Sequence, residues 1–250
     1  MKLLAFIPAR LESHRFPKKI IKNIFGLPMI EHVIRRIKYS NIFDEIVVVT
    51  NNLRIKKMIK HKDIKVVLSK EKHSNGTSRV SEISKNFNYN LGVILFADEP
   101  FLDPKKLKII IKKLKKIKNF DVINVVTKLK KNDLDSKEIV KCETNKKGII
   151  ENYFRNKKKI KKGNKLFKSS GILIFKKKIL DSYKILKKTN EENKFKIEQF
   201  RFLKNNLKLK SIFVDNIYPS INTKKEFNEI IKLIKSKKSE LKLIEKLKYL

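Results

Sequence analysis

The chain has 250 residues, of which 41% are hydrophobic, so it can bury the core of one domain and is not a disordered protein. It contains no run of about 18 apolar residues, which argues against a membrane-spanning helix. The single cysteine, Cys142, excludes an internal disulfide and suits the reducing cytoplasm, where we expect the protein to reside.

The net charge of +38 comes mostly from lysine, because eight of the 63 basic residues are arginine. Lysines spread along the whole chain favour solvated helix faces over a nucleic-acid-binding surface, which would concentrate them in one stripe. A basic nucleic-acid-binding protein therefore stays the non-enzymatic alternative. In either case a positive field attracts anionic substrates.

The first half alternates between short apolar runs and segments of helical periodicity. Five β-branched runs predict strands over Leu3–Pro8, Glu45–Thr50, Ile64–Leu68, Leu91–Phe96 and Asp121–Val126. Helices are predicted between them, over Pro28–Tyr39, Asn52–His61, Ser78–Phe87 and Pro104–Lys118. This order is typical of an α/β protein with a Rossmann-like, mostly parallel sheet covered by helices on both faces. Ligands of such sheets bind at the carboxyl ends of the strands.

The second half is less regular. Strands are predicted over Lys137–Cys142, Gly148–Tyr153, Gly171–Phe175 and Lys208–Val214, with a basic loop at Asn156–Lys165. Helices are predicted over Lys177–Lys187, over Lys194–Lys204 and from Thr223 onward. In the basic tail, Ser236–Leu250, Glu240 and Glu245 favour a packed terminal helix over one that lies on a membrane surface.

Three cations follow the first predicted strand: Arg10, Arg15 and Lys19. Guanidinium and ammonium groups at the carboxyl end of a buried strand suit a triphosphate, although this is not a glycine-rich Walker loop. Two carboxylates, Asp98 and Glu99, follow the fourth strand. Asp98 can hold Mg²⁺ against substrate phosphates, because Mg²⁺ typically uses one or two carboxylates and keeps waters. The alternative for the three cations is a charged surface turn. The alternative for the two carboxylates is that Asp98 caps a turn and Glu99 is solvated.

A polar loop precedes the third predicted helix. Gly76 permits a ligand to approach the backbone closely, and Thr77 or Ser78 can cap the helix. Its free N–H groups would suit a pyrimidine edge or a phosphate, although a capped helix without further function is the alternative.

A later predicted helix carries Glu198, Gln199 and Arg201. Glu198 and Arg201 are three residues apart and can share a face, where the alternative to a binding role is a surface ion pair of little energetic consequence. Arginine is rare in this chain, so its presence in these segments suggests positions that need a planar, bidentate donor.

Together and in this order, these motifs resemble the family of 3-deoxy-manno-octulosonate (Kdo) cytidylyltransferases. Ile7 to Lys19 is similar to the family opening I-P-A-R-x-x-S-x-R-x-P-x-K, and Gly26 to Ile30 to G-x-P-M-I. The later segments resemble H-x-S-G-T-x-R and G-D-E-P, at His73 to Arg79 and Asp98 to Pro100. Further short motifs of the family are matched by Val140-Lys141, Arg155, Gly171-Ile172 and Glu198-Gln199-x-Arg201. The resemblance covers nearly the whole chain.

The resemblance implies a nucleotidyltransferase of the glycosyltransferase-A-like type that joins CTP and Kdo into CMP-Kdo and pyrophosphate, for lipopolysaccharide synthesis. It implies that nucleotide is bound by Pro8, Ala9, Arg10, Arg15, Lys19, Asn75, Gly76, Thr77 and Arg79. The implied catalytic residues are Asp98, Arg10 and Lys19, and the implied Mg²⁺ ligands are Asp98 and residue 222. The implied sugar-binding residues are Arg155, Ser169, Glu198 and Gln199.

The resemblance also implies one catalytic domain over residues 1–250 that forms a homodimer. Residues 1–127 would bind mainly the nucleotide, and residues 128–250 would bind mainly the sugar and the second subunit. No specific nucleic acid is expected as a partner.

The chain departs from the family pattern at several positions. Asn222 stands where the family has a metal-binding aspartate, and Ser169 stands where it has a histidine; Lys18, Asn75 and Ser78 also differ from it. An amide oxygen binds Mg²⁺ more weakly than a carboxylate does, so a weakened nucleotide-binding paralogue is one alternative. The changed sugar side leaves a second alternative, a cytidylyltransferase for a modified octulosonate or a nonulosonic acid.

Overall fold

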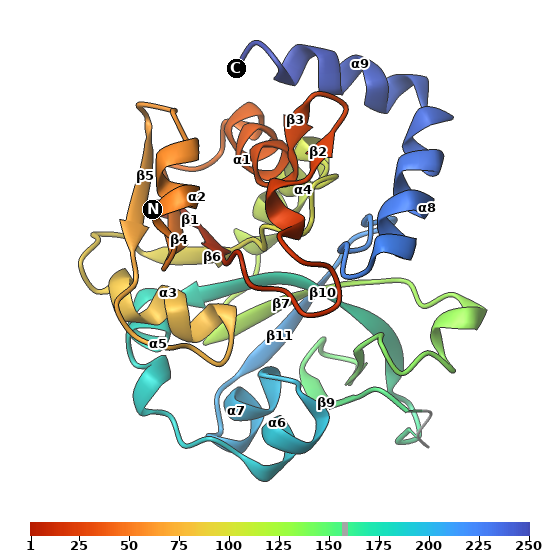
Figure 1. Ribbon diagram of the computed structural model, residues 1–250. Helices are drawn as coiled ribbons and strands as arrows, with labels where there is room; N and C mark the ends of the chain where they lie inside the picture. Colours follow the sequence, from red (N-terminus) through yellow and green to blue (C-terminus); the bar gives the residue numbers. More distant parts are fainter. Residues whose placement is uncertain (157–159) are drawn as a thin grey trace.

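The computed structural model describes residues 1–156 and 160–250 of the chain (Figure 1). Among these residues, nine strands form one sheet with the order β11-β7-β10-β6-β1-β4-β5, and β8 and β9 continue from β10. They are β1 Leu3–Ala9, β4 Glu45–Thr50, β5 Ile64–Leu68, β6 Leu91–Ile94, β7 Val122–Thr127, β8 Lys141–Thr144, β9 Ile150–Phe154, β10 Lys165–Lys176 and β11 Leu209–Phe213. A small hairpin consists of β2 Asn23–Ile24 and β3 Leu27–Pro28.

The sheet is mostly parallel, which confirms the predicted fold class. Strand β1 pairs in parallel with β4 and β6, β4 with β5, and β7 with β11. Strand β10 lies antiparallel between β6 and β7. The parallel strands therefore end at one edge of the sheet, and the first half of β10 begins at that same edge.

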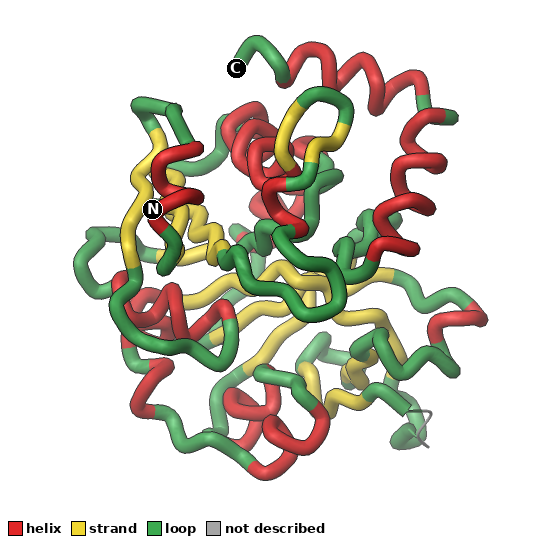
Figure 2. The backbone as a smooth tube through the Cα atoms, in the orientation of Figure 1, coloured by secondary structure: helices red, strands yellow, loops and turns green. Residues whose placement is uncertain are grey.

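Helices cover both faces of this sheet, as Figure 2 shows. The α-helices are α1 Met29–Ser40, α2 Leu53–Met58, α3 Gly76–Ser84, α4 Pro104–Leu114, α5 Lys177–Asp181, α6 Asn190–Phe195, α7 Gln199–Lys204, α8 Lys224–Lys235 and α9 Lys238–Leu247. The 3₁₀ helices are η1 Lys19–Ile21, η2 Lys131–Asp133 and η3 Tyr183–Ile185.

The two faces have separate cores because side chains of a strand alternate between them. Leu3, Ala5 and Ile7 of β1 belong to the core under α1, α2 and α4. Leu4 and Phe6 belong to the core that contains residues of α3, α5 and α7. All seven residues of β1 are buried, which explains its uninterrupted apolar sequence.

Several predicted boundaries differ from the structure. The helix predicted over Lys194–Lys204 is two helices, because Lys196 adopts a left-handed φ of 53° that ends α6. The helix predicted over Lys177–Lys187 is divided into α5 and η3. The strand predicted over Gly171–Phe175 is the end of the longer β10. The basic loop predicted over Asn156–Lys165 falls partly outside the described residues, and Lys165 already belongs to β10.

The chain ends in a third apolar cluster that joins α8 and α9 to the rest of the molecule. It includes Phe16 of the loop after β1, Phe101, Ile221, Ile234 and Ile244. The prediction of a packed terminal helix is confirmed, because α9 contacts α1. In the described part of the chain, the helices are all too short or too polar to cross a membrane.

Candidate active site

A cleft of about 900 Å³ opens where β1, β6 and β7 end. Its lining includes all but one of the residues predicted for the site: Pro8, Ala9, Arg10, Arg15, Lys19, Asn75, Gly76, Arg79, Asp98, Arg155, Ser169, Glu198, Gln199 and Asn222. The remaining one, Thr77, is fully buried in the first turn of α3. The fold thus brings together segments that lie far apart in the sequence.

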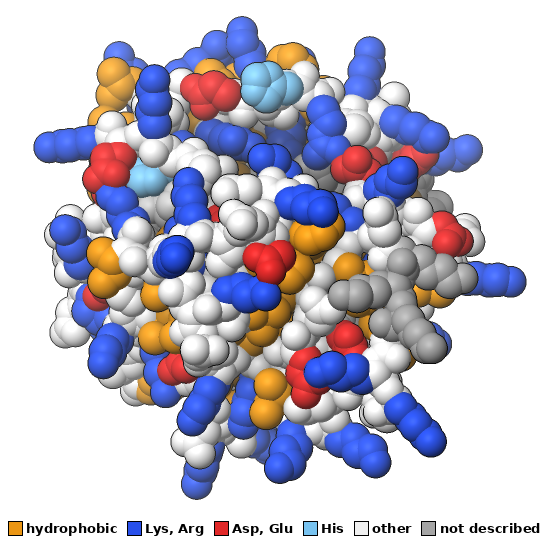
Figure 3. Space-filling view, turned by 90° about the horizontal axis from the view of Figure 1, so that it is seen from below, with side chains coloured by type: hydrophobic (Ala, Val, Ile, Leu, Met, Phe, Trp, Pro, Cys, Tyr) orange, Lys and Arg blue, Asp and Glu red, His pale blue; other side chains and the backbone are white. Residues whose placement is uncertain are grey.

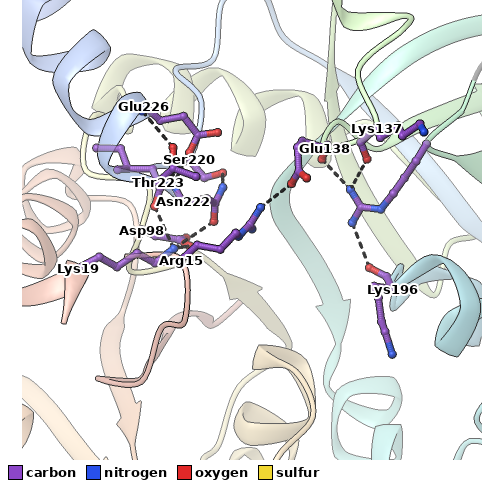
Figure 4. Close-up of polar contacts among 12 residues, drawn as sticks. Arg15, Lys19, Asp98, Lys137, Glu138, Lys196, Ser220, Asn222, Thr223 and Glu226 are labelled. Carbon is purple, nitrogen blue, oxygen red and sulfur yellow. Dashed lines mark hydrogen bonds and ion pairs between the residues drawn. The ribbon is translucent and has the colours of Figure 1, made fainter. Parts of the chain in front are cut away.

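The ammonium group of Lys19 is held by three oxygen atoms in this cleft (Figure 4). Lys19 Nζ lies 2.6 Å from Asp98 Oδ2, 2.9 Å from the carbonyl oxygen of Ile221 and 3.1 Å from Asn222 Oδ1. Asn222 Nδ2 donates to Ser220 Oγ at 3.0 Å, which points the amide oxygen toward Lys19. The ammonium group of Lys19 therefore joins the loop after β6 to the segment before α8.

These oxygens are the kind of ligand that Mg²⁺ prefers. Among residues 1–156 and 160–250, no group of three or more His, Cys, Asp or Glu side chains forms a metal site. Around the ammonium group of Lys19, the protein offers the carboxylate of Asp98, with the weaker amide oxygen of Asn222 nearby. Such a set fits a Mg²⁺ ion that is bound jointly with substrate phosphates, because Mg²⁺ typically needs one or two carboxylates and completes its shell with phosphate and water.

The loop after β1, residues 10–18, is anchored at its middle by an apolar side chain, whereas its arginine side chains are exposed. Phe16 is buried against Phe227 of α8, with ring centroids 5.4 Å apart. Arg15 is half exposed and reaches across to Glu138, 2.6 Å away (Figure 4). Arg10 is exposed at the cleft. The loop therefore presents guanidinium groups that can exchange solvent or Glu138 for an anionic ligand.

The start of α3 corrects one prediction. Asn75, and not Thr77 or Ser78, caps the helix: its Oδ1 accepts from the N–H of Ser78 at 2.8 Å, and its Nδ2 donates to the hydroxyl of Tyr183 at 2.8 Å. A Cβ atom at Gly76 would lie 2.5 Å from a ring atom of Phe96, so only glycine fits here. The helix start is thereby packed directly against the ends of β1 and β6.

Glu99 is buried, which contradicts the interpretation that it is solvated. The residue is 8% exposed, and burial, followed by the neighbouring charge of Asp98, raises the pKa of its carboxyl to about 8. It lies against Gly171 of β10, where a Cβ atom would be 2.2 Å from Glu99 Oε1. This contact fixes the distance between the residues after β6 and the wall formed by β10.

Glu198 is half-buried with its carboxyl oxygen Oε2 shielded from solvent, and the surface ion pair considered with Arg201 is wrong. Arg201 instead binds Glu192 with two hydrogen bonds of 2.8 and 2.6 Å. Glu198 Oε1 accepts a hydrogen bond of 3.0 Å from the hydroxyl of Thr77. Desolvation raises the pKa of Glu198 to about 7. Thr77 and Glu198 thus join α3 to the start of α7.

The raised pKa of Glu198 predicts a pH-dependent stability. The folded protein keeps this proton up to about pH 7, whereas the unfolded chain loses it near 4.5, so the free energy of unfolding falls as pH rises between these values. We expect the change in the free energy of unfolding caused by Glu198→Gln to be about 1–3 kcal/mol more stabilising at pH 8 than at pH 5. Denaturant unfolding of both proteins at the two pH values tests this. An equal difference at both would show that the carboxyl is ionised in the folded state.

Arg155 has partners that the sequence did not indicate. Its guanidinium donates to the carbonyl oxygens of Lys137, Glu138, Phe195 and Lys196, at distances of 2.6 to 3.3 Å. It thereby joins the loop before β8 to the junction of α6 and α7, on two sides of the cleft. Its predicted contact with a sugar carboxylate stays a prediction.

Asn124 is a site-supporting residue that the sequence reasoning missed. It is fully buried in β7, where its Oδ1 accepts from Ser169 Oγ at 2.6 Å and its Nδ2 donates to the carbonyl oxygen of Ser170 at 3.0 Å. These bonds hold the irregular part of β10 between Ser169 and Leu173. The available signal was a lone amide in an otherwise apolar strand, since a buried polar side chain needs partners.

The sheet and the cleft, with cations facing a carboxylate at the strand ends, define an α/β nucleotidyltransferase. A family model described as cytidylyltransferase matches residues 4–212, and the chain belongs to this family.

Individual relatives match over nearly the whole chain. The 3-deoxy-manno-octulosonate cytidylyltransferase of Fusobacterium nucleatum is 30% identical over 240 residues, which are 94% of this chain and 98% of that protein. The mitochondrial protein of the same name from Arabidopsis thaliana is 28% identical over 244 residues, 94% of this chain and 84% of that protein. The structure of a CMP:2-keto-3-deoxy-manno-octonic acid synthetase complexed with CTP has the same fold, with a TM-score of 0.85, 22% identity, and coverage of 93% of this chain and 98% of that one.

Proposed function

We propose that this protein transfers the cytidylyl group of CTP to Kdo and releases pyrophosphate. The observation that carries the proposal is the cleft, which gathers all but one of the residues expected for this reaction at one edge of the sheet. The similarity to proteins named Kdo cytidylyltransferase over more than nine-tenths of the chain supports the same acceptor.

In this reaction, the oxygen of the sugar's anomeric hydroxyl attacks the α-phosphorus of CTP. The new P–O bond forms as the bond to the β-phosphate breaks, pyrophosphate leaves, and the hydroxyl proton passes to solvent or a neighbouring base. Reactions of this kind depend mainly on positioning and on neutralising charge. Arg10, Arg15 and Lys19 would bind the triphosphate, and the residues at the start of α3 would hold the nucleoside.

We propose that Asp98 holds Mg²⁺ together with the phosphates. Such an ion would offset phosphate charge and lower the pKa of the attacking hydroxyl. Lys19 Nζ contacts Asp98 through Oδ2, so the second oxygen of this carboxylate would hold the metal, and the ammonium group beside it would bind the triphosphate.

The sugar side, the subunit arrangement and the compartment are part of the same proposal. Arg155, Ser169, Glu198 and Gln199 would contact the acidic sugar, and the second half of the chain would form a homodimer in the cytoplasm. On the face in Figure 3, Lys and Arg side chains are scattered and do not gather in one stripe, so the nucleic-acid alternative gains no support from that view.

The test is pyrophosphate release from CTP with Kdo and Mg²⁺, alongside UTP, ATP and a reaction without sugar. We expect release that requires both CTP and the sugar. Release with a nonulosonic acid but not with Kdo would favour the modified-sugar alternative. Binding of CTP without any release would favour the weakened paralogue.

Asn222→Asp is expected to lower the Mg²⁺ concentration needed for half-maximal activity by about tenfold, because a second carboxylate raises the charge available to the cation. A Mg²⁺ titration of the initial rate measures this. Asn88→Asp adds the same charge at an exposed position outside the cleft and serves as the matched control. Equal Mg²⁺ requirements for all three proteins would remove Asn222 from the metal site.

A further inference from the structure

The C-terminal segment contributes to the cleft although the family match ends at residue 212. Tyr218, Ser220 and Glu226 line the cleft, and Glu226 Oε2 accepts from the N–H of Asn222 at 2.6 Å. In Figure 1, α8 and α9 (blue) lie on the same side of the sheet as α1 and α4. The last helix does not itself line the cleft, so its connection to the site has to pass through other residues.

Arg36 of α1 provides that connection. Its side chain is fully buried, and its Nη2 lies 2.8 Å from Glu240 Oε2 of α9. A buried guanidinium is costly without a carboxylate partner, so this ion pair fixes both side chains. Arg36 Nη1 also donates to the carbonyl oxygen of Leu102 at 3.4 Å, and its guanidinium lies 5.4 Å from the ring centroid of Phe101. One side chain thus joins α9 to the residues that follow Asp98.

The loop from Asp98 to Leu102 is held at both ends. At its start, the carbonyl oxygen of Asp98 accepts from the N–H of Ile221 at 2.9 Å, and the carboxylate binds Lys19. Within the loop, the N–H of Leu102 donates to the carbonyl oxygen of Glu99 at 3.3 Å. At its end, Arg36 connects the loop to α9 through polar contacts, while Phe101 also packs against His32 of α1, with ring centroids 5.9 Å apart.

We propose that Glu240 and Arg36 are positioning residues that hold the loop which presents Asp98 to the cleft. The terminal helix thereby helps to position the carboxylate of Asp98, the proposed metal ligand. The effect on turnover rests on the proposed function, whereas the effect on the loop does not.

The test uses the double variant Arg36→Met/Glu240→Met in the full-length protein. Replacing a buried ion pair by apolar side chains of similar volume is often neutral for stability, so the variant can fold while the contact with Leu102 is lost. The N–H of Glu99 donates to the carbonyl oxygen of Phe96 at 3.1 Å, and that of Leu102 to Glu99. We expect hydrogen exchange of these two amides to rise about tenfold, because their hydrogen bonds open more often. We expect kcat to fall about 10²-fold, with KM for CTP nearly unchanged, since small misplacements of a reacting group have effects of that size.

Arg35→Met is the matched control. Arg35 lies next to Arg36 on α1 and also holds α9, by donating to the carbonyl oxygens of Leu247 and Lys248 at 2.8 and 3.0 Å, and it pairs with Glu31. We expect this variant to unfold at a lower temperature while keeping the wild-type kcat and the wild-type exchange of the loop.

The results separate the two proposals. Wild-type exchange and kcat in the double variant would overturn the positioning role, as would equal changes in Arg35→Met, which would indicate general docking of α9. If the double variant does not fold, Glu240→Gln, which removes the negative charge that holds Arg36, is measured in the same way, and wild-type exchange in it would count against the role. A wild-type protein without sugar-dependent turnover would remove the proposed function, and the exchange comparison would still decide the positioning role.

Discussion

Asp98→Ala is expected to lower kcat/KM for CTP by about 10³-fold while the protein stays folded, because it removes the carboxylate proposed to hold the Mg²⁺ that would offset phosphate charge. The side chain of Asp98 is 24% exposed, so its loss leaves no large cavity. Lys19 loses its partner at 2.6 Å but keeps the oxygens of Ile221 and Asn222. Steady-state kinetics and thermal unfolding of the same preparation measure the two effects.

Asp103→Ala is the matched control for this variant. Asp103 lies five residues further along and caps α4, where its Oδ1 accepts from the N–H of Lys105 at 2.8 Å. We expect this variant to lose about 1 kcal/mol of stability and to keep its activity, which is the opposite pattern. Normal turnover by Asp98→Ala would rule out Asp98 as the proposed metal ligand.

Gly171→Ala is expected to have the second-largest effect, although it adds a single methyl group. The new Cβ atom would lie 2.2 Å from Glu99 Oε1 and 3.1 Å from Phe96, so the β10 wall or the loop after β6 has to move. We expect about 1–3 kcal/mol less stability, as is typical of an overpacked core. We also expect kcat/KM to fall about 10²-fold, because Asp98 precedes Glu99 directly and shifts with it. Chemical denaturation and kinetics measure both.

Gly148→Ala separates this effect from the general cost of replacing a glycine. Gly148 has a left-handed φ of 72°, and its nearest neighbour to a new Cβ is Ser211 Oγ at 3.6 Å. We expect this variant to lose stability through backbone strain and to keep its activity. The interpretation of Gly171 would be wrong if its alanine variant behaved in the same way.

The sequence alone determined the fold class, because the period of the apolar residues distinguishes strands from helices and continuous apolar strands indicate a sheet covered on both faces. The predicted strands Glu45–Thr50 and Ile64–Leu68 agree with the structure to the residue. The resemblance of short motifs to a known family also pointed to many of the residues that line the cleft, because motifs in a fixed order carry chemical information that does not depend on knowing the distances between them.

Only the tertiary structure decided how those residues are connected. Whether a carboxylate is solvated depends on what packs over it, so the burial of Glu99 by Gly171 and the bond between Glu198 and Thr77 could not be read from local sequence. The same holds for Arg36 and Glu240, which are 204 residues apart. Patterns of three or four residues report on one element, whereas burial, pKa and positioning arise from contacts between elements, and these exist only once the chain has folded.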